Sequence, residues 1–189
     1  MPYIRRARAL GVELRSRGYN PNRDGNSGRF TSGVGGRNDL TEDEWGSIMT
    51  YISSKSYFIN EDLRLGNELS DMNKETVKNL DSALKKLPKY EGDVTRSVTL
   101  CFENPKKQFL DEHKKGEVVS YLAFTSATRG DIYDPKANVQ ISIKNSKNAR
   151  DLTKYNSAEQ EILYERNAKF KVLDVSFNDG VYYMEFEEV

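Results

Sequence analysis

The stretch Ser157-Ala158-Glu159-Gln160-Glu161-Ile162-Leu163 places two carboxylates one residue apart, directly before an apolar run. In an extended chain, residues i and i+2 project to the same face, so Glu159 and Glu161 are expected to point side by side into one site. Two neighbouring acids on a solvated strand are more often plain surface. The meaning of this pair therefore depends on what precedes it in the chain.

Upstream of the acids, helix patterns come first and strand patterns follow. Order is expected from Asp39, with one helix capped by Thr41, a second containing Glu61–Leu65, and a third over Asn73–Leu87 that ends at Pro88. Beyond Pro88 we predict a helix over Lys106–His113 and strands over Val94–Phe102, Val118–Ser126, Val139–Ile143, Ile162–Arg166, Lys169–Phe177 and Val181–Glu187. Asn178-Asp179-Gly180 indicates a hairpin turn between the last two strands. Helices followed by antiparallel-looking strands predict an α+β domain, not a doubly wound α/β fold.

The first 38 residues differ in composition from the rest of the chain. Residues 1–38 hold eight arginines, no lysine and two acids, and residues 18–38 hold six glycines. Such a segment buries too little apolar surface to offset its ordering entropy, so we predict a flexible Arg/Gly-rich tail over 1–38 and one domain over 39–189. The tail carries a net charge of about +6 and the domain about −6, although the whole chain is neutral. A net-acidic domain repels a polyphosphate, so a nucleic acid is not an expected partner.

Other features of the sequence exclude several classes of protein. Arginines interrupt every short apolar run near the N-terminus, so no signal peptide is seen, and no run is long enough for a membrane span. We therefore expect a cytoplasmic location. Cys101 is the only cysteine and is predicted to lie in the core. His113 is the only histidine and is predicted on a solvated helix face, which leaves no histidine-based acid–base chemistry or zinc site.

Three segments upstream of the acids carry polar residues of interest: Ile59-Asn60-Glu61-Asp62-Leu63-Arg64, Arg96 followed by Ser97, and Phe124-Thr125-Ser126-Ala127-Thr128. Each also has an ordinary explanation. Arg64 would be a solvated arginine at a helix end, and Arg96 an outward-facing arginine on an edge strand. The hydroxyl residues after Phe124 would mark the place where a strand gives way to a turn. Taken together, Arg96, Ser126 and Glu161, spaced by 30 and 35 residues, resemble the R-S-E class of mono-ADP-ribosyltransferases. That class includes clostridial toxins and exoenzymes, and the resemblance extends to phage head-associated proteins and covers about residues 40–189. The location that it implies is the cytoplasm of a bacterial host cell or association with a phage virion.

This resemblance implies a split, two-sheet antiparallel β core with an N-terminal helical layer. It also implies a set of NAD-binding residues. Arg96 would bind NAD and shape the nicotinamide site, the backbone of Ser97 would bind the nicotinamide amide, and Arg64, in the Asn60-containing motif, would reach a phosphate. Ser126 would hydrogen-bond the catalytic glutamate, and Thr128 would take the last place of a Ser-Thr-Ser motif whose middle residue is here Ala127. Arginine suits phosphate because its planar fork of donors binds oxygens bidentately.

The same resemblance gives the two acids different roles. Glu161 would stabilise the cationic state formed as nicotinamide leaves, and Glu159 would orient and help deprotonate an acceptor arginine. Tyr155 would help to recognise the target protein, and no metal is expected. Arg129 and Tyr133, in the loop that follows the serine motif, are further candidates without an assigned role.

The expected activity is therefore transfer of ADP-ribose from NAD to a protein arginine by a toxin, an effector or a phage protein, without a membrane partner. Tail arginines of the chain itself are possible acceptors. Two alternatives remain at this point. The domain would hydrolyse NAD with water as acceptor, or it would be a non-catalytic phage structural or adaptor protein.

Overall fold

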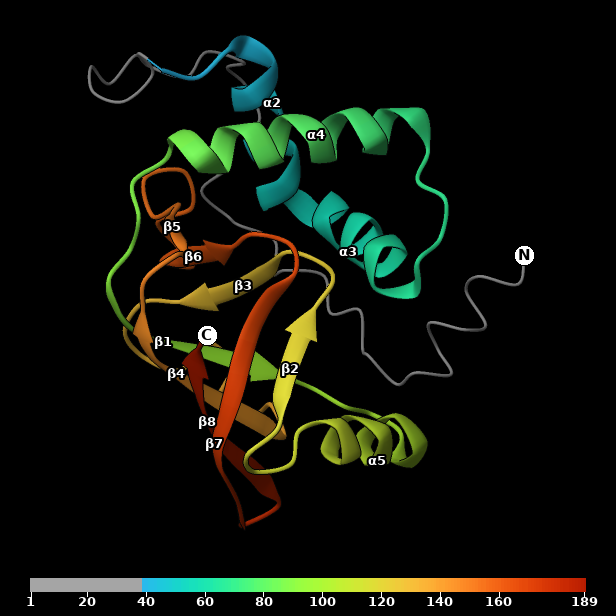
Figure 1. The fold of residues 1–189 in the computed structure, drawn as a ribbon, viewed down its shortest axis with the longest axis vertical. Coiled ribbons are helices and arrows are strands. Elements are labelled where there is room, and N and C mark those ends of the chain that lie inside the picture. The colour runs from blue at the N-terminus through green and yellow to red at the C-terminus, as the bar shows by residue number, and fades with distance from the viewer. Residues whose placement is uncertain (1–38) are drawn as a thin grey trace.

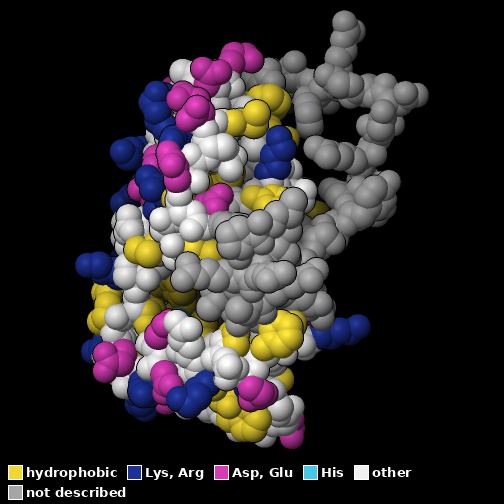
Figure 2. Space-filling view, turned by 90° about the vertical axis from the view of Figure 1, so that its right-hand side faces the viewer, with side chains coloured by type: hydrophobic (Ala, Val, Ile, Leu, Met, Phe, Trp, Pro, Cys, Tyr) yellow, Lys and Arg dark blue, Asp and Glu magenta, His cyan; other side chains and the backbone are white. Residues whose placement is uncertain are grey.

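The computed structural model describes residues 39–189; the predicted tail over 1–38 lies outside the described residues. In Figure 1, helices α2, α3 and α4 form a layer over strands β3, β6 and β5, whereas α5 lies at the other end of the molecule. Within the described part of the chain, no helix is long and apolar enough to cross a membrane. Figure 2 shows acidic and basic side chains interspersed on the face drawn there, without a large area of one sign among the described atoms.

The helical layer begins where the sequence indicates. Helix α2 (Glu42–Thr50) starts at a capping box, in which Thr41 Oγ1 accepts from the Glu44 amide and the Glu44 carboxylate accepts from the Thr41 amide. A π-helical turn, η1 (Tyr51–Lys55), contains Ser53 in an extended conformation, φ −89° and ψ 177°, and this kink leads the chain into α3 (Ser56–Leu65). Helix α4 (Asp71–Lys86) is the one predicted over Asn73–Leu87. Apolar side chains of all three helices form a buried cluster with Phe124, Leu152 and Leu163.

Eight strands form the sheet. They are β1 (Gly92–Val98), β2 (Val118–Tyr121), β3 (Thr125–Thr128), β4 (Val139–Ser146), β5 (Arg150–Asp151), β6 (Glu161–Tyr164), β7 (Ala168–Asn178) and β8 (Val181–Glu188). Their order across the sheet is β2-β7-β8-β4-β1-β3-β6-β5. The pair β4–β8 is parallel, which corrects the expectation of a wholly antiparallel core. The predicted turn is present, because Asn178 pairs with Val181 and the two residues between them have positive φ.

The two expected sheets are parts of one hydrogen-bonded sheet: a large wing of β2, β7, β8, β4 and β1, and a small wing of β3, β6 and β5. Strands β1 and β3 share a single residue pair, Thr95 with Thr128. Both wings supply side chains to one apolar cluster: Ala127 and Ile162 come from the small wing, and Ile141 and Phe170 from the large wing. The β1–β3 junction is therefore the place where the two wings meet, and both contribute to one apolar core.

The predicted strand over Val118–Ser126 is two strands in the structure. Strand β2 pairs with β7 in the large wing, and β3 pairs with β1 and β6 at and beyond the junction. Residues 122–124 carry the chain from one wing to the other, with Leu122 exposed and Phe124 buried in the helical cluster. This break brings Ser126 next to β6.

Two single residues lie differently from their predictions. His113 follows α5 (Glu103–Glu112) and is buried: its ring stacks on Phe109, and its nitrogens contact Phe109 O and Tyr121 Oη, each at 2.7 Å. With both nitrogens in hydrogen bonds, the imidazole can be buried at little cost. Cys101 is exposed rather than in the core, because β1 ends at Val98.

Candidate active site

Glu161 is the first residue of β6, and it is almost fully buried, with 1% of its surface exposed. Ser126 Oγ donates a hydrogen bond to Glu161 Oε1 at 2.7 Å, and Asn156 Nδ2 donates one to Oε2 at 2.8 Å. Each oxygen of the buried carboxylate thus has a donor, as buried polar groups require. The Ser126 contact is the one that the family resemblance leads us to expect.

Glu159 lies in a turn before β6, not on a strand. Its Oε2 accepts from the same Asn156 Nδ2 at 3.0 Å, and its Oε1 accepts from Tyr133 Oη at 3.4 Å. One amide group therefore bridges both carboxylates. Gln160, between the acids, has a left-handed φ of 46°. The two acids do converge, but a left-handed turn produces this convergence, and the alternation of a strand does not.

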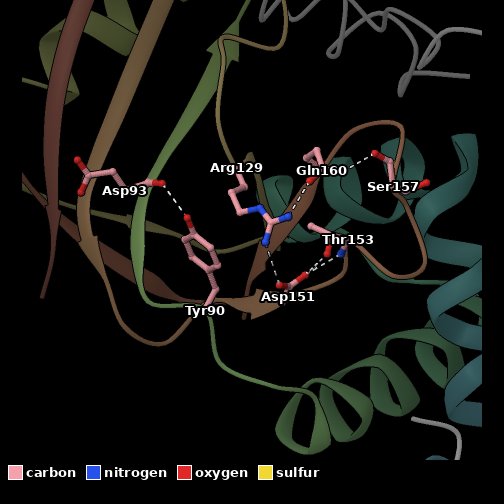
Figure 3. Close-up of polar contacts among 7 residues, drawn as sticks. All are labelled: Tyr90, Asp93, Arg129, Asp151, Thr153, Ser157 and Gln160. Carbon is pink, nitrogen blue, oxygen red and sulfur yellow. Dashed lines mark hydrogen bonds and ion pairs between the residues drawn. The ribbon is translucent and has the colours of Figure 1, made fainter. Parts of the chain in front are cut away.

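Arg129, the first residue after β3, contacts this turn (Figure 3). Its backbone N–H donates to Gln160 O at 3.0 Å, and its Nη2 donates to Gln160 Oε1 at 2.9 Å. Its Nη1 lies 3.8 Å from Asp151 Oδ2, while Asp151 Oδ1 accepts from the backbone N–H and the hydroxyl of Thr153 at 2.8 and 2.6 Å. These contacts connect the end of β3, the turn and β5.

Arg96 lies on β1, which has β4 on one side and β3 on the other, so the alternative of an edge strand is wrong. Its side chain is half-buried, and Nη1 donates to the backbone oxygen of Ser126. Burial lowers the pKa of His113, and the nearby positive charge of Arg96 acts in the same direction. Ser126 therefore connects Arg96, through its carbonyl, with Glu161, through its hydroxyl.

Ser97 fixes the loop between β3 and β4. Its Oγ donates to Gln140 Oε1 at 2.8 Å and accepts from the Asp134 amide at 3.1 Å. Gln140 Nε2 donates to Asp134 O at 2.7 Å, and Thr95 Oγ1 donates to Asp131 O at 3.2 Å. The loop that carries Tyr133 is therefore held against β1 and β4 on both sides of that residue.

The remaining predicted residues lie farther out or have other contacts. Thr128 pairs with Glu161 across β3 and β6. Asn60 Nδ2 donates to Tyr51 Oη at 2.9 Å within the helical layer, and Arg64 is exposed in the last turn of α3. Tyr155 is partly buried against the helical cluster, and this burial raises the pKa of its phenol. Its role in target recognition stays a prediction.

Two residues of the site escape sequence reasoning. Asn156, and not its neighbour Tyr155, contacts both acids, and Gln160 sets the backbone between them. Asparagine before serine is typical of turns, and this pattern carries no signal that the amide faces a carboxylate. The contact between Arg129 and Gln160 joins residues 31 positions apart, which local patterns do not reveal.

The arrangement suits a ligand that is anionic at one end and becomes cationic at the other. The guanidinium of Arg96 can bind phosphate oxygens, and the fixed carboxylate of Glu161 can stabilise a positive charge that develops beside it. Glu159, next to Glu161 and less buried, can bind a second cation such as a guanidinium. Among residues 39–189, no group of three or more His, Cys, Asp or Glu side chains is arranged to hold a metal ion.

Comparisons with known proteins identify relatives of this chain. The chain is 26% identical over 151 residues to the NAD(+)–protein-arginine ADP-ribosyltransferase Tre1 of Serratia proteamaculans, a match over 79% of this chain and 33% of that protein. It therefore spans about a third of the length of this curated relative.

Solved structures show the same fold. Exoenzyme S from Pseudomonas aeruginosa superposes with a TM-score of 0.67 at 16% identity, covering 79% of this chain and 75% of that one. The C3 exoenzyme of Clostridium limosum gives a TM-score of 0.65 at 13% identity, covering 80% and 87%. The family model of the ADP-ribosyltransferase exoenzymes matches residues 34–188, which is most of the chain. The chain therefore belongs to the ADP-ribosyltransferase exoenzyme family, and its α+β fold is the fold of that family.

Proposed function

We propose that this domain transfers ADP-ribose from NAD to an arginine side chain of a protein and releases nicotinamide. The observation that carries the proposal is the buried Glu161, held by Ser126 and joined to Glu159 through Asn156. Family membership supports ADP-ribosyl transfer. The relative from Serratia proteamaculans is named as an enzyme that modifies protein arginine, and exoenzyme S has been solved bound to carba-NAD.

In the first part of the reaction, the bond between the ribose C1 and the pyridinium nitrogen of NAD breaks. The electron pair leaves with nicotinamide, which becomes neutral, and positive charge develops on the ribose. The Glu161 carboxylate stabilises this charge, and it is already held in place by hydrogen bonds from Ser126 and Asn156, so it need not reorganise during the step. Arg96 supports the same step by binding phosphate oxygens of the substrate with the fork of its guanidinium.

In the second part, a nitrogen of the acceptor arginine forms the new bond to the ribose C1, and the guanidinium loses one proton. Glu159 suits both needs, because a carboxylate binds a guanidinium as an ion pair and accepts a proton. Asn156 and Tyr133 hold Glu159 on opposite oxygens. Hydrolysis of NAD needs Glu161 but not Glu159, since water needs no anionic partner to bind.

The test compares Glu159→Gln and Glu161→Gln in two assays, which are labelling of a protein arginine and release of nicotinamide from NAD without acceptor. Glu159→Gln is expected to abolish labelling and to leave slow nicotinamide release, whereas Glu161→Gln is expected to lose both. Glu75→Gln, an exposed glutamate on α4, is the matched control. Equal loss of both activities in the Glu159 variant contradicts the division of roles, and nicotinamide release without labelling in the wild type supports NAD hydrolysis as the main activity.

We also propose that tail arginines such as Arg23, Arg29 or Arg37 serve as acceptors when no target is present. Eight of the chain's thirteen arginines lie in residues 1–38, and a covalently attached acceptor has a high effective concentration. Intact-mass analysis after incubation with NAD is expected to show added ADP-ribose that is lost when residues 1–38 are deleted. An unmodified mass, from protein that is active on an external arginine, would refute this proposal and leave the main one in place.

A further inference from the structure

The turn between the two acids is held in an unfavourable backbone conformation. Gln160 has φ 46°, a left-handed conformation that costs a non-glycine residue about 1–2 kcal/mol. Residues keep such a conformation only where their surroundings impose it. The acids on either side of Gln160 share the amide of Asn156, so the conformation of Gln160 decides whether both carboxylates face the same place.

Arg129 makes two contacts that hold Gln160 in this conformation. This residue binds Gln160 twice, through its backbone N–H to the Gln160 carbonyl and through its guanidinium to the Gln160 side chain. The amide group of Gln160 is oriented from its other side as well, because Nε2 donates to Ser157 O at 2.7 Å. Figure 3 shows the guanidinium of Arg129 placed between Gln160 and Asp151.

Asp151 gives the guanidinium a fixed partner. It lies on β5, where it pairs with Ile162 of β6 and its N–H donates to Pro88 O at 3.1 Å. Its carboxylate is also fixed by the two hydrogen bonds from Thr153. The guanidinium therefore has a rigid carboxylate on one side and the turn on the other.

We propose that Arg129 is a positioning residue, which acts through Gln160 to hold Glu159 beside Glu161. The inference rests on the proposed function, because it concerns the acceptor side of the same site. Glu161 has independent supports in its strand pairing with Thr128 and its hydrogen bond from Ser126. Glu159 lies in the turn itself, so release of the turn displaces Glu159 more than Glu161.

The proposal is tested with Arg129→Ala in the full chain, by measuring kcat and KM for two reactions. These are transfer to arginine methyl ester and hydrolysis of NAD without acceptor. A misplacement of about 1 Å costs on the order of 100-fold, and the backbone contact from Arg129 N–H survives the substitution, so we expect a loss in transfer kcat of about tenfold. The kcat of hydrolysis and the KM for NAD should change by less than about twofold.

Arg166→Ala is the matched control, because Arg166 is also ion-paired, to Asp81 on α4, but lies outside the turn. It should lower the melting temperature and leave the ratio of transfer to hydrolysis unchanged. An Arg129→Ala variant with an unchanged ratio would refute the positioning role. So would a raised KM for NAD in both reactions, which would place Arg129 on the substrate phosphates instead.

A second variant tests the backbone conformation itself. Asparagine adopts left-handed φ more readily than glutamine, so Gln160→Asn added to Arg129→Ala should recover at least about twofold of the lost transfer. No recovery means that Arg129 does not act through this conformation. The wild-type chain in the same assays separates the two proposals: if it turns over no NAD, the proposed function fails, whereas active wild type with no recovery refutes only the role of Arg129.

Discussion

Replacing Glu161 by glutamine removes one negative charge and leaves the size of the side chain almost unchanged. The structure allows glutamine to keep contacts with Asn156 and Ser126. Its oxygen can accept from Asn156 Nδ2, and its Nε2 can donate to Ser126 Oγ if the serine hydroxyl turns its hydrogen away. Because glutamine can keep a hydrogen bond to Ser126 and one to Asn156, we expect a change in the free energy of unfolding of about 1 kcal/mol or less.

The effect on catalysis is expected to be much larger. Loss of one preorganised electrostatic partner of the transition state typically lowers the rate by about 100-fold or more, which corresponds to about 2.7 kcal/mol. The lost charge is buried and held by two donors, so bulk water cannot replace it. Binding of NAD in the ground state should survive, because Arg96 is untouched.

The assay is release of nicotinamide at saturating NAD, with and without an arginine acceptor. NAD affinity by calorimetry and the melting temperature are measured on the same preparation, so that a loss of rate is separated from loss of binding or folding. Glu161→Asp adds a useful contrast: it keeps the charge but shortens the side chain by one methylene, so it should fall between wild type and Glu161→Gln. Nicotinamide release at the wild-type rate from a folded Glu161→Gln variant would remove Glu161 from the catalytic role.

Three further predictions concern other parts of the chain. Arg96→Lys keeps the positive charge but loses the guanidinium fork, so calorimetry should show weaker NAD binding at a normal melting temperature; unchanged affinity would mean that Arg96 does not contact NAD. Lys86, followed by Ser82 and the Thr41 backbone, holds the pKa of Glu44 at about 2, below the ordinary 4.5. The charged form of Glu44 therefore adds stability above pH 4.5 that is lost as the pH falls toward 2, and Glu44→Gln should flatten this part of the acid dependence in urea unfolding at pH 7 and pH 3. Gly180→Ala meets no atom within 4 Å but sits at φ 83°, so its cost is one of backbone strain. We expect about 1 kcal/mol, a fall of roughly 2–4 °C in melting temperature, and an unchanged melting temperature would contradict the strain.

Local patterns in the sequence were sufficient to predict most of the helices, strands and turns. The capping box at Thr41, the helix over α4 and the turn at Asp179-Gly180 all depend on residues within a few positions of one another, and the structure confirms them. The wrong predictions concern features that depend on residues far away in the sequence. His113 is buried because Phe186 and Tyr121 come to it from β8 and β2, and the break between β2 and β3 exists because the two strands pair in different wings.

The active-site residues also divide into those that strand pairing places and those that contacts in turns place. Thr95, Thr128 and Glu161 form one row across β1, β3 and β6, and a slip of one residue in either pairing would turn Glu161 to the other face of the sheet. Strand alternation therefore fixes Ser126 and Glu161 on one face. Arg96, next to Thr95, projects from the other face of β1 and reaches Ser126 only at its backbone oxygen. The order and spacing of the three residues are visible in the sequence. Asn156 and Gln160 lie in the turns before β6, and Arg129 follows β3; no alternation constrains these residues.

This division matches the two halves of the proposed reaction. In the proposed reaction, the strand-borne residues act on NAD, a step that is the same for every acceptor, and Glu159 in the turn faces the acceptor. A turn held by side-chain contacts such as Arg129 to Gln160 can change its acceptor contacts without disturbing the row of paired strands. Substitutions in residues 157–160 should therefore alter the choice between arginine and water as acceptor while nicotinamide release persists. Substitutions at Ser126 or Arg96 should reduce transfer and hydrolysis together.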